Sequence, residues 1–383
     1  MTIRVLHGDC RDALKTLPAD SVHTCVTSPP YWGLRDYGVA GQIGLEPTMA
    51  EFVAEMVAVF REVRRVLRPD GTLWLNLGDS YAANAGNGNG GRHGTGDTWG
   101  GTGVDKRGGG LKPKDLCGIP WRVAFALQTD GWWLRQDIIW AKPNPMPESV
   151  TDRCTKAHEY MFLMSKGPRY FYDAEAIVES AIHAGRVVEY DGSQKNSAAA
   201  SDPKMRTRID QNVTVKDTRN KRSVWTVATA PFSEAHFATF PPDLIEPCIK
   251  AGTSERGCCA KCGAPWERVI RKGDLVPVND RGRRDNLGKK FDDTGMSQAT
   301  NRSRDGHKSG QAYENETVGW RPPCKCAAPA APCTVLDPFG GAGTTGLVAD
   351  RLQRNAVLIE LNPQYAAMAE RRIHNDAPLF AEA

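Results

Sequence analysis

A short polar and aromatic segment directly follows an apolar run near the start of the chain. The run extends from Val22 to Val26 and predicts a buried strand, which leads into Thr27-Ser28-Pro29-Pro30-Tyr31-Trp32. The two prolines lack N–H groups and fix the backbone, so the carbonyls of Ser28 and Pro29 stay free to accept hydrogen bonds. Tyr31 offers a flat face, and stacking of a base on such a ring contributes roughly 1–3 kcal/mol. The segment therefore predicts a site for a planar exocyclic amine.

A glycine-rich turn follows a second apolar run, from Cys333 to Asp337, and leads into a helical pattern that begins near Thr344. Glycines let a ligand approach the backbone closely, and the helix directs its first N–H groups at what is bound. Glu360 ends the next predicted strand about 20 residues after the turn, where a carboxylate can accept from ribose hydroxyls. Together these features indicate a nucleotide cofactor site, whereas the turn alone would indicate only a tight connection.

The two segments together resemble the amino-group DNA methyltransferases, which use S-adenosylmethionine to modify N4 of cytosine or N6 of adenine. The resemblance rests on Thr27-Ser-Pro-Pro-Tyr-Trp and on Asp337-Pro-Phe-Gly-Gly-Ala-Gly-Thr-Thr. In that family Asp, Asn or Ser precedes Pro-Pro and an aromatic residue, and Asp-Pro-Phe precedes Gly-x-Gly-Thr-Thr. The catalytic motif comes first here, which is similar to the permuted order of the family's beta group.

The resemblance implies the roles of individual residues. Its catalytic residues would be Ser28, Pro29, Pro30 and Tyr31. Its cofactor residues would include Asp9, beside the adenine, and Phe240, in a segment that closes over the methionine end; Phe237 in that segment departs from the family's usual small residue or proline. The remaining implied cofactor residues are Asp337, Pro338, Phe339, Gly341, Gly343, Thr344, Thr345 and Glu360.

In this chemistry the target base leaves the duplex and stacks on Tyr31, while Ser28 Oγ and the Pro29 carbonyl accept its amine hydrogens. No covalent bond to the protein is needed, which distinguishes the chain from cytosine-C5 methyltransferases with their cysteine nucleophile. Its Pro-Cys dipeptides occur in other contexts, namely a helix, a cysteine pair and a strand.

Ser28 favours cytosine N4 as the target, because serine is more usual in the cytosine-N4 members and Asp-Pro-Pro-Tyr in the adenine-N6 members. Adenine N6 is the alternative. A further alternative is a non-catalytic, zinc-containing DNA-binding protein, against which the intact Ser28, Tyr31 and Asp337 argue. RNA or protein methylation is less favoured, since basic segments in the chain suit duplex DNA.

Alternating predicted strands and helices indicate a three-layer α/β fold with a mostly parallel sheet. The resemblance implies that this is a permuted, Rossmann-like methyltransferase domain. Apolar residues from Met49 to Leu67 have helical spacing, and Thr72 to Leu77 predicts the next strand. A strand from Trp132 to Trp140 is expected to pair as a hairpin with Glu159 to Met164.

Changes in composition predict five segments. These are the catalytic half at 1–180 with a mobile Gly-rich loop at 84–110, a basic insertion at 181–222, the cofactor-closing segment at 223–257, a cysteine-containing insertion at 258–326, and the cofactor-binding half at 327–383. Within the fourth segment, the charged stretch from Lys272 to Tyr313 is expected to be flexible.

The basic insertion is the candidate target-recognition region. Its cationic residues are interleaved with Asn and Thr, a mixture that suits phosphate contacts and base-edge hydrogen bonds. A solvated charged loop is the alternative. The candidate DNA-binding residues are Lys204, Arg206, Arg208, Lys216, Arg219, Lys221 and Arg222.

Two close pairs of cysteines indicate a structural tetrahedral zinc site. The second pair has one intervening residue and not two, and Cys258 or Cys333 could replace one ligand. Four unconnected free cysteines are the alternative. The candidate ligands are Cys259, Cys262, Cys324 and Cys326.

The 383 residues carry a net charge of only +4, so a DNA partner must be met by local basic clusters. No apolar run is long enough to span a bilayer, and no charged-then-apolar leader occupies the start, so the cytosol is the expected location. The resemblance implies that this is the cytosol of a bacterium, with the protein encoded by the host or by a virus. The expected partners are double-stranded DNA and a cognate restriction endonuclease.

Overall fold

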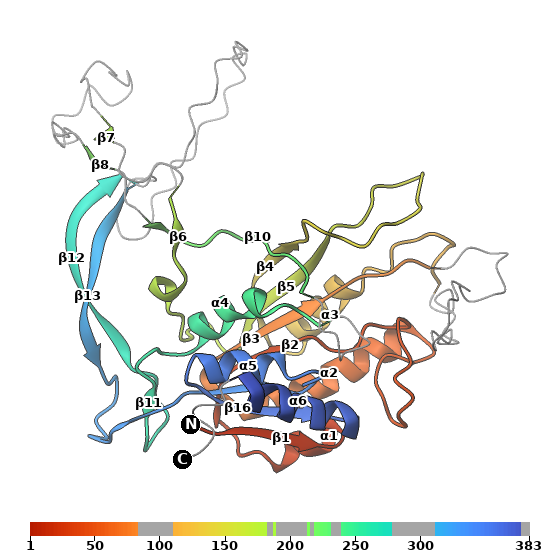
Figure 1. Ribbon diagram of the computed structural model, residues 1–383, viewed down its shortest axis with the longest axis horizontal. Coiled ribbons are helices and arrows are strands. Elements are labelled where there is room, and N and C mark those ends of the chain that lie inside the picture. The colour runs from red at the N-terminus through yellow and green to blue at the C-terminus, as the bar shows by residue number, and fades with distance from the viewer. Residues whose placement is uncertain are drawn as a thin grey trace, which may run out of the picture. The chain divides into compact units, whose positions relative to one another are not determined.

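The computed structural model describes residues 1–82, 110–181, 187–188, 213–214, 218–230, 239–277 and 311–376 (Figure 1). Almost all of the expected Gly-rich loop and most of the basic insertion lie outside the described residues. Contacts divide the chain into two compact units. Unit 1 comprises Met1–Ala176, Arg222–Trp266 and Pro322–Ala383, and unit 2 comprises Ile177–Lys221 and Glu267–Arg321. The five expected segments stay a prediction.

An eight-stranded sheet forms the centre of unit 1, in the order β1-β16-β15-β2-β3-β5-β4-β10. Its neighbours pair in parallel, except that β5 runs antiparallel to both β3 and β4. The expected hairpin is therefore present. The strands are β1 (Ile3–His7), β2 (Val22–Thr27), β3 (Leu67–Leu77), β4 (Trp133–Ala141), β5 (His158–Ser165), β10 (Val224–Thr226), β15 (Thr334–Asp337) and β16 (Asn355–Glu360).

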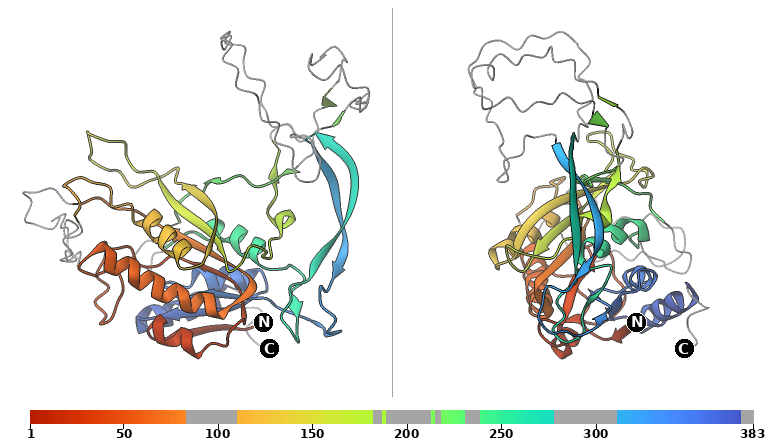
Figure 2. Two further views of the ribbon diagram at one scale, coloured as in Figure 1. Left: turned by 180° about the vertical axis from the view of Figure 1, so that it is seen from behind. Right: turned by 90° about the vertical axis from the view of Figure 1, so that its left-hand side faces the viewer.

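Helices cover both faces of this sheet, as Figures 1 and 2 show from opposite sides. One face carries α2 (Met49–Val66) and α3 (Ile119–Thr129), and the other carries α4 (Pro242–Gly252), α5 (Thr344–Arg351) and α6 (Pro363–Asp376). The short α1 (Cys10–Ala13) follows β1. The predicted three-layer α/β fold is thus confirmed. Among the described residues, no helix has the length and apolar character needed to cross a membrane.

Helix α2 illustrates how local sequence produces these elements. It begins with a capping box, in which Thr48 accepts from the Glu51 N–H and Glu51 accepts from the Thr48 N–H. Its apolar residues recur at helical spacing and are buried against the sheet. The strand that follows was expected to start at Thr72, but β3 starts at Leu67, because Leu67 already pairs with Val22 ahead of a register shift.

Unit 2 is built on an antiparallel ribbon of β12 (Glu267–Pro277) and β13 (Gln311–Arg321). The stretch from Lys272 to Tyr313 was expected to be flexible, but its two ends form paired strands, and residues 278–310 lie outside the described residues. Charges of opposite sign face each other across the strands, Arg271 with Glu316 and Arg321 with Glu267, so the charged residues support pairing. The smaller pairs are β6 (Glu179–Ser180) with β9 (Thr218–Arg219) and β7 (Val187–Val188) with β8 (Val213–Thr214).

A buried carboxylate joins the two sequence motifs inside the sheet. Strand β15 pairs in parallel with β2, and Asp337 accepts hydrogen bonds from Thr27 Oγ1 and Thr345 Oγ1, each at 2.6 Å. The N–H of Phe339 donates to the same group at 3.0 Å. Asp337 is 1% exposed, and burial raises the pKa of its carboxyl to about 6 in spite of these donors.

We expect the pH dependence of stability to report this buried group. The folded protein binds the Asp337 proton more tightly than the unfolded chain does, so the group favours folding at low pH, and this contribution is lost as the pH rises through about 6. Asp337→Asn cannot titrate. The unfolding free energy of the wild type relative to this variant should fall by about 1 kcal/mol between about pH 5 and about pH 8 in urea titrations. An equal difference at both pH values would contradict the raised pKa.

Candidate active site

The carboxyl ends of the parallel strands bring the sequence motifs to one edge of the sheet. Asp9 follows β1, Glu360 ends β16, Asp337 ends β15 and Ser28 follows β2. Ligands of open α/β sheets bind at this edge. A cavity of about 910 Å³ lies here, in unit 1, at the upper end of the usual range for small-molecule sites.

Most of the predicted catalytic and cofactor residues line this cavity. The catalytic set does so completely, and the lining residues from the predicted cofactor set are Asp9, Phe240, Pro338, Phe339, Gly341, Thr344 and Glu360. The other three are not among its lining residues. Thr345 hydrogen-bonds Asp337, and Gly343, with a φ of 76°, packs so closely on α6 that a Cβ there would lie 2.7 Å from the Ala369 Cβ. Asp337, Gly343 and Thr345 therefore do not face the cavity but stabilise the glycine turn between β15 and α5, which does.

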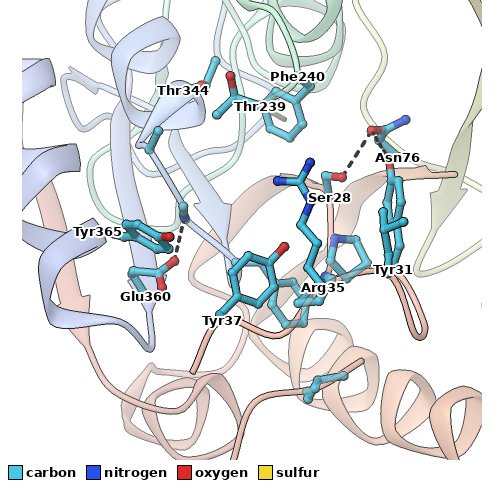
Figure 3. Close-up of a pocket in the computed structure, with 18 of the residues that line it drawn as sticks. Ser28, Tyr31, Arg35, Tyr37, Asn76, Thr239, Phe240, Thr344, Glu360 and Tyr365 are labelled. Carbon is cyan, nitrogen blue, oxygen red and sulfur yellow. Dashed lines mark hydrogen bonds between the residues drawn. The ribbon is translucent and has the colours of Figure 1, made fainter. Parts of the chain in front are cut away.

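A carboxylate marks one end of the cavity. Glu360 accepts from the N–H of Gly341 at 2.7 Å and from that of Asn362 at 2.8 Å, so it is fixed across the glycine turn (Figure 3). Burial raises the pKa of Glu360. Tyr365 lies beside it in Figure 3, and Thr344 lies nearby on α5. This end offers an oriented acceptor for hydroxyl groups, next to aromatic surface.

Asp9 contributes a second carboxylate to the cavity wall. It pairs with Arg11 at 2.5 Å and accepts from the Arg11 N–H at 2.8 Å. The hydrogen bonds from Arg11 lower the pKa of Asp9, so this carboxyl is ionised at neutral pH.

Ser28 lies toward the other end of the cavity, where its hydrogen is already engaged. Its Oγ donates to Asn76 Oδ1 at 3.2 Å (Figure 3). Asn76 Nδ2 donates to the Tyr160 carbonyl at 3.1 Å, which fixes the amide with its oxygen toward Ser28. With its hydrogen held by Asn76, the Ser28 oxygen presents lone pairs and can act as an acceptor for an amine.

Tyr31 is held by a chain of charged groups. Its hydroxyl donates to Glu159 Oε2 at 2.7 Å, and Glu159 Oε1 accepts from Lys142 Nζ at 2.5 Å. The Lys142 ammonium also lies 4.2 Å from the centre of the Trp140 ring. Burial and the neighbouring Glu159 raise the pKa of Tyr31 well above its ordinary value. The phenol therefore stays protonated, and its ring is fixed at the cavity wall.

Several lining residues were missed by the sequence reasoning. Asn76 left a signal, because it is a polar residue inside the otherwise apolar end of β3. The others left none, since the fold alone brings together Arg35, Tyr37, Lys142, Glu159 and Tyr365. They come from a loop, from the end of β4, from β5 and from α6.

The candidate DNA-binding residues are only partly described. Arg219 is buried and pairs with Glu179 at 2.9 Å within unit 2, a position that argues against a phosphate contact by this residue. Lys221 and Arg222 are described, and neither lines the cavity. Outside the described residues lie Lys204, Arg206, Arg208 and Lys216. The four candidate zinc ligands form a separate cluster in unit 1.

Glycine at position 78 is expected to be necessary for this arrangement. A Cβ at Gly78 would lie 2.5 Å from Tyr31 Cε2, so Gly78→Ala must displace the ring and should lower the unfolding free energy by about 1–3 kcal/mol. Gly167→Ala is the matched control, because its Cβ would meet only the Pro69 carbonyl oxygen at 3.9 Å. Urea unfolding measures both variants. Equal stability of the two would contradict the close contact between Gly78 and Tyr31.

Comparisons with known proteins agree with this geometry. A family model described as DNA methylase (N6_N4_Mtase) matches residues 22–260 and 333–371. The type II methyltransferase M.XycI of Xanthomonas campestris pv. cyanopsidis is 39% identical over 372 residues, covering 96% of this chain and 87% of that protein. M.SmaI of Serratia marcescens, also a type II methyltransferase, is 38% identical over 380 residues, covering 97% and 90%.

A solved structure shares the fold. The cytosine-N4-specific PvuII DNA methyltransferase superposes with a TM-score of 0.50 at 16% identity, covering 98% of this chain and 90% of that one. The family match and the identity to the two relatives extend over most of the chain. The chain therefore belongs to the N6/N4 family of DNA methylases, enzymes that use S-adenosylmethionine to methylate DNA.

Proposed function

We propose that this DNA methyltransferase is specific for N4 of cytosine, within a recognition site in duplex DNA. The observation that carries the proposal is the neutral acceptor at Ser28, whose hydrogen is held by Asn76. The motif Ser-Pro-Pro-Tyr is the form more usual in cytosine-N4 members of the family. The nearest lining carboxylate in this network, Glu159, is engaged by Tyr31 and Lys142.

An aromatic amine is a poor nucleophile because its lone pair is delocalised into its ring, and the proposed mechanism must overcome this. Ser28 Oγ accepts one amine hydrogen and the Pro29 carbonyl accepts the other, which favours a pyramidal nitrogen with its lone pair localised. S-adenosylmethionine would supply the electrophilic methyl group and leave as S-adenosylhomocysteine, and the methylated amine would release one proton to solvent. Since the acceptors are fixed before the base arrives, the protein contributes mainly position and electrostatics.

Tyr31 is the proposed stacking surface for the flipped base. Extrusion of a base costs a few kcal/mol, and stacking returns roughly 1–3 kcal/mol of it. The hydrogen bond from the Tyr31 hydroxyl to Glu159 and the contact with Gly78 restrict the movement of the ring. Little side-chain entropy is therefore lost when the base binds.

The cofactor is proposed to lie toward the Glu360 end of the cavity. Glu360 would accept from the ribose hydroxyls, Asp9 would lie by the adenine, and Phe240 would cover the methionine end. Supporting this assignment, Glu360 is fixed by two backbone N–H groups, as an acceptor for a pair of hydroxyls should be. The cavity of about 910 Å³ is large enough for a nucleoside cofactor and a base together.

DNA recognition is proposed to involve unit 2. Its two segments are far apart in sequence but form one unit. The first segment contains the candidate DNA-binding residues from Lys204 to Lys221, and Arg222 directly follows it. The relatives are named type II methyltransferases. A cognate restriction endonuclease for this chain is accordingly part of the proposal.

Two alternative functions would give different results in the experiments below. Adenine-N6 transfer would use the same two acceptors, and the neutral Ser28 would then not indicate which base is methylated. A non-catalytic DNA-binding protein is disfavoured by the intact acceptors, the ordered Tyr31 and the lined cavity.

The base is identified by incubating the protein with tritiated S-adenosylmethionine and unmethylated duplex DNA, followed by nucleoside digestion and mass spectrometry. We expect N4-methylcytosine. N6-methyladenine would overturn the assignment to cytosine while retaining the mechanism. Absence of any methylated nucleoside, despite bound cofactor and varied DNA sequences, would overturn the proposed reaction on DNA.

Variants of the acceptor network test the mechanism separately from the base. Ser28→Ala removes one acceptor, and Asn76→Leu removes the group that holds the Ser28 hydrogen. Each should lower the single-turnover rate by about 10²-fold or more while changing the dissociation constant of S-adenosylmethionine less than about threefold. An unchanged rate in both variants would contradict the role given to Ser28.

A further inference from the structure

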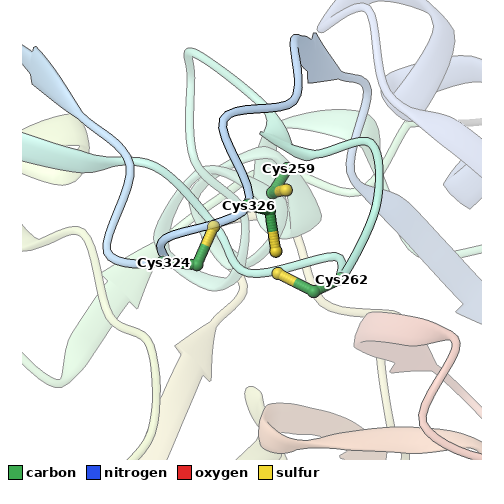
Figure 4. A group of neighbouring side chains, drawn as sticks. All are labelled: Cys259, Cys262, Cys324 and Cys326. Atoms are coloured by element: carbon green, nitrogen blue, oxygen red, sulfur yellow. The ribbon is translucent and has the colours of Figure 1, made fainter.

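Four cysteines from two separate segments gather at one point in unit 1, and none of them lines the cavity (Figure 4). Strand β11 (Cys258–Cys259) pairs antiparallel with β14 (Ala330–Ala331), which brings the two segments together. The sulfur atoms all lie within 4.8 Å of one another. They belong to Cys259, Cys262, Cys324 and Cys326.

The first pair sits in a tight turn that keeps its two sulfurs within 4.8 Å of each other. The N–H groups of Lys261 and Cys262 donate to the Cys259 sulfur. The Gly263 N–H donates to the Cys259 carbonyl at 2.8 Å, and Gly263 has a φ of 69°, which favours glycine. In the second pair, the Cys326 N–H donates to the Cys324 sulfur. Backbone donors of this kind stabilise thiolate charge beside a metal.

The turn is also anchored to the sheet. His23 on β2 contacts the Gly263 carbonyl at 2.8 Å, and Arg68 Nη1 donates to the Cys262 carbonyl at 2.8 Å. A Cβ on Gly263 would lie 2.7 Å from Arg68 Nη1. The cysteine turn is exposed at Cys262, and groups that are not themselves ligands hold it in place.

A neighbouring cluster of His23, Cys258 and Cys333 does not offer the same chemistry, although its candidate ligand atoms also lie within 4.8 Å of one another. The Thr334 N–H donates to His23 Nδ1 at 3.0 Å, so that nitrogen carries no hydrogen. His23 Nε2 then carries the hydrogen and donates it to Gly263. Both ring nitrogens are thus engaged, and the imidazole has no free lone pair for a metal.

We propose that Cys259, Cys262, Cys324 and Cys326 bind one Zn²⁺ as a structural tetrathiolate site. Four soft sulfur ligands in two close pairs match tetrahedral zinc and leave no open coordination position. Zinc–sulfur bonds of about 2.3 Å require sulfurs about 3.8 Å apart, which small side-chain rotations from the observed spacing achieve.

The ion would join the chain on either side of the segment that forms much of unit 2. Cys262 precedes Glu267, where that segment begins, and Cys324 follows Arg321, where it ends. Because the ion binds the folded chain and not the unfolded one, its binding free energy adds to the stability of the fold. The role is therefore structural, apart from the chemistry of the cavity.

Metal analysis of the full-length protein, purified without added metal or chelator, tests the site directly. We expect about one zinc per chain by inductively coupled plasma mass spectrometry. Cys262→Ser and Cys326→Ser should each reduce the content to below about 0.2 per chain. Cys154→Ser, which alters an exposed cysteine outside the cluster, is the matched control and should retain the metal. Less than about 0.1 zinc per chain in the wild type would overturn the proposal.

Cobalt substitution guards against loss of metal through misfolding of the variants. Wild-type protein reconstituted with Co²⁺ should show the intense visible bands and sulfur-to-metal charge transfer of a tetrahedral tetrathiolate. Weak octahedral bands, or ferric thiolate absorption in the protein as purified, would overturn a tetrathiolate zinc site. Neither measurement depends on the DNA target or on methyl transfer, so failure here is distinguishable from failure of the proposed function.

Discussion

The buried carboxylate of Asp337 is the contact on which the rest of the site depends. It lies at the end of β15 and accepts from Thr27 at the end of β2 and from Thr345 at the start of α5. Thr27 directly precedes the Ser-Pro-Pro-Tyr motif, and Thr345 belongs to the glycine turn. One desolvated group therefore aligns the segment proposed to hold the base with the segment proposed to hold the cofactor. Burial of this carboxyl costs free energy and raises its pKa, and the three hydrogen-bond donors offset part of that cost.

Two sets of hydrogen bonds fix side chains at the two ends of the cavity. At one end, Glu360 is fixed by the backbone of the glycine turn. At the other, Asn76 holds the hydrogen of Ser28, and Glu159 holds that of Tyr31. Both sets use groups whose hydrogen bonds are satisfied before any ligand binds, so the site is organised in advance. The cysteine cluster is separate from the cavity, and the role proposed for it is structural.

The sequence alone predicts the fold, the motifs and the edge of the sheet at which they meet, because strand and helix periodicity and the two motifs are local patterns. It also predicts Ser28, Tyr31 and Glu360 as cavity residues. It does not separate Asp337, Gly343 and Thr345, which shape the turn, from the residues that line the cavity, since that distinction depends on side-chain direction. Nor does it reveal Lys142 or Glu159, whose partners come from other strands. The charged ribbon of β12 and β13 was missed because its charges are paired only across the strands.

One cavity of unit 1 is proposed to hold both the cofactor and the target base. A crystal structure of the chain with S-adenosylhomocysteine and a duplex containing its target would test it most directly. We predict an extruded cytosine stacked on Tyr31, with N4 between Ser28 Oγ and the Pro29 carbonyl, and the cofactor ribose on Glu360. A target base seated elsewhere, or a cofactor bound away from Glu360, would contradict the account.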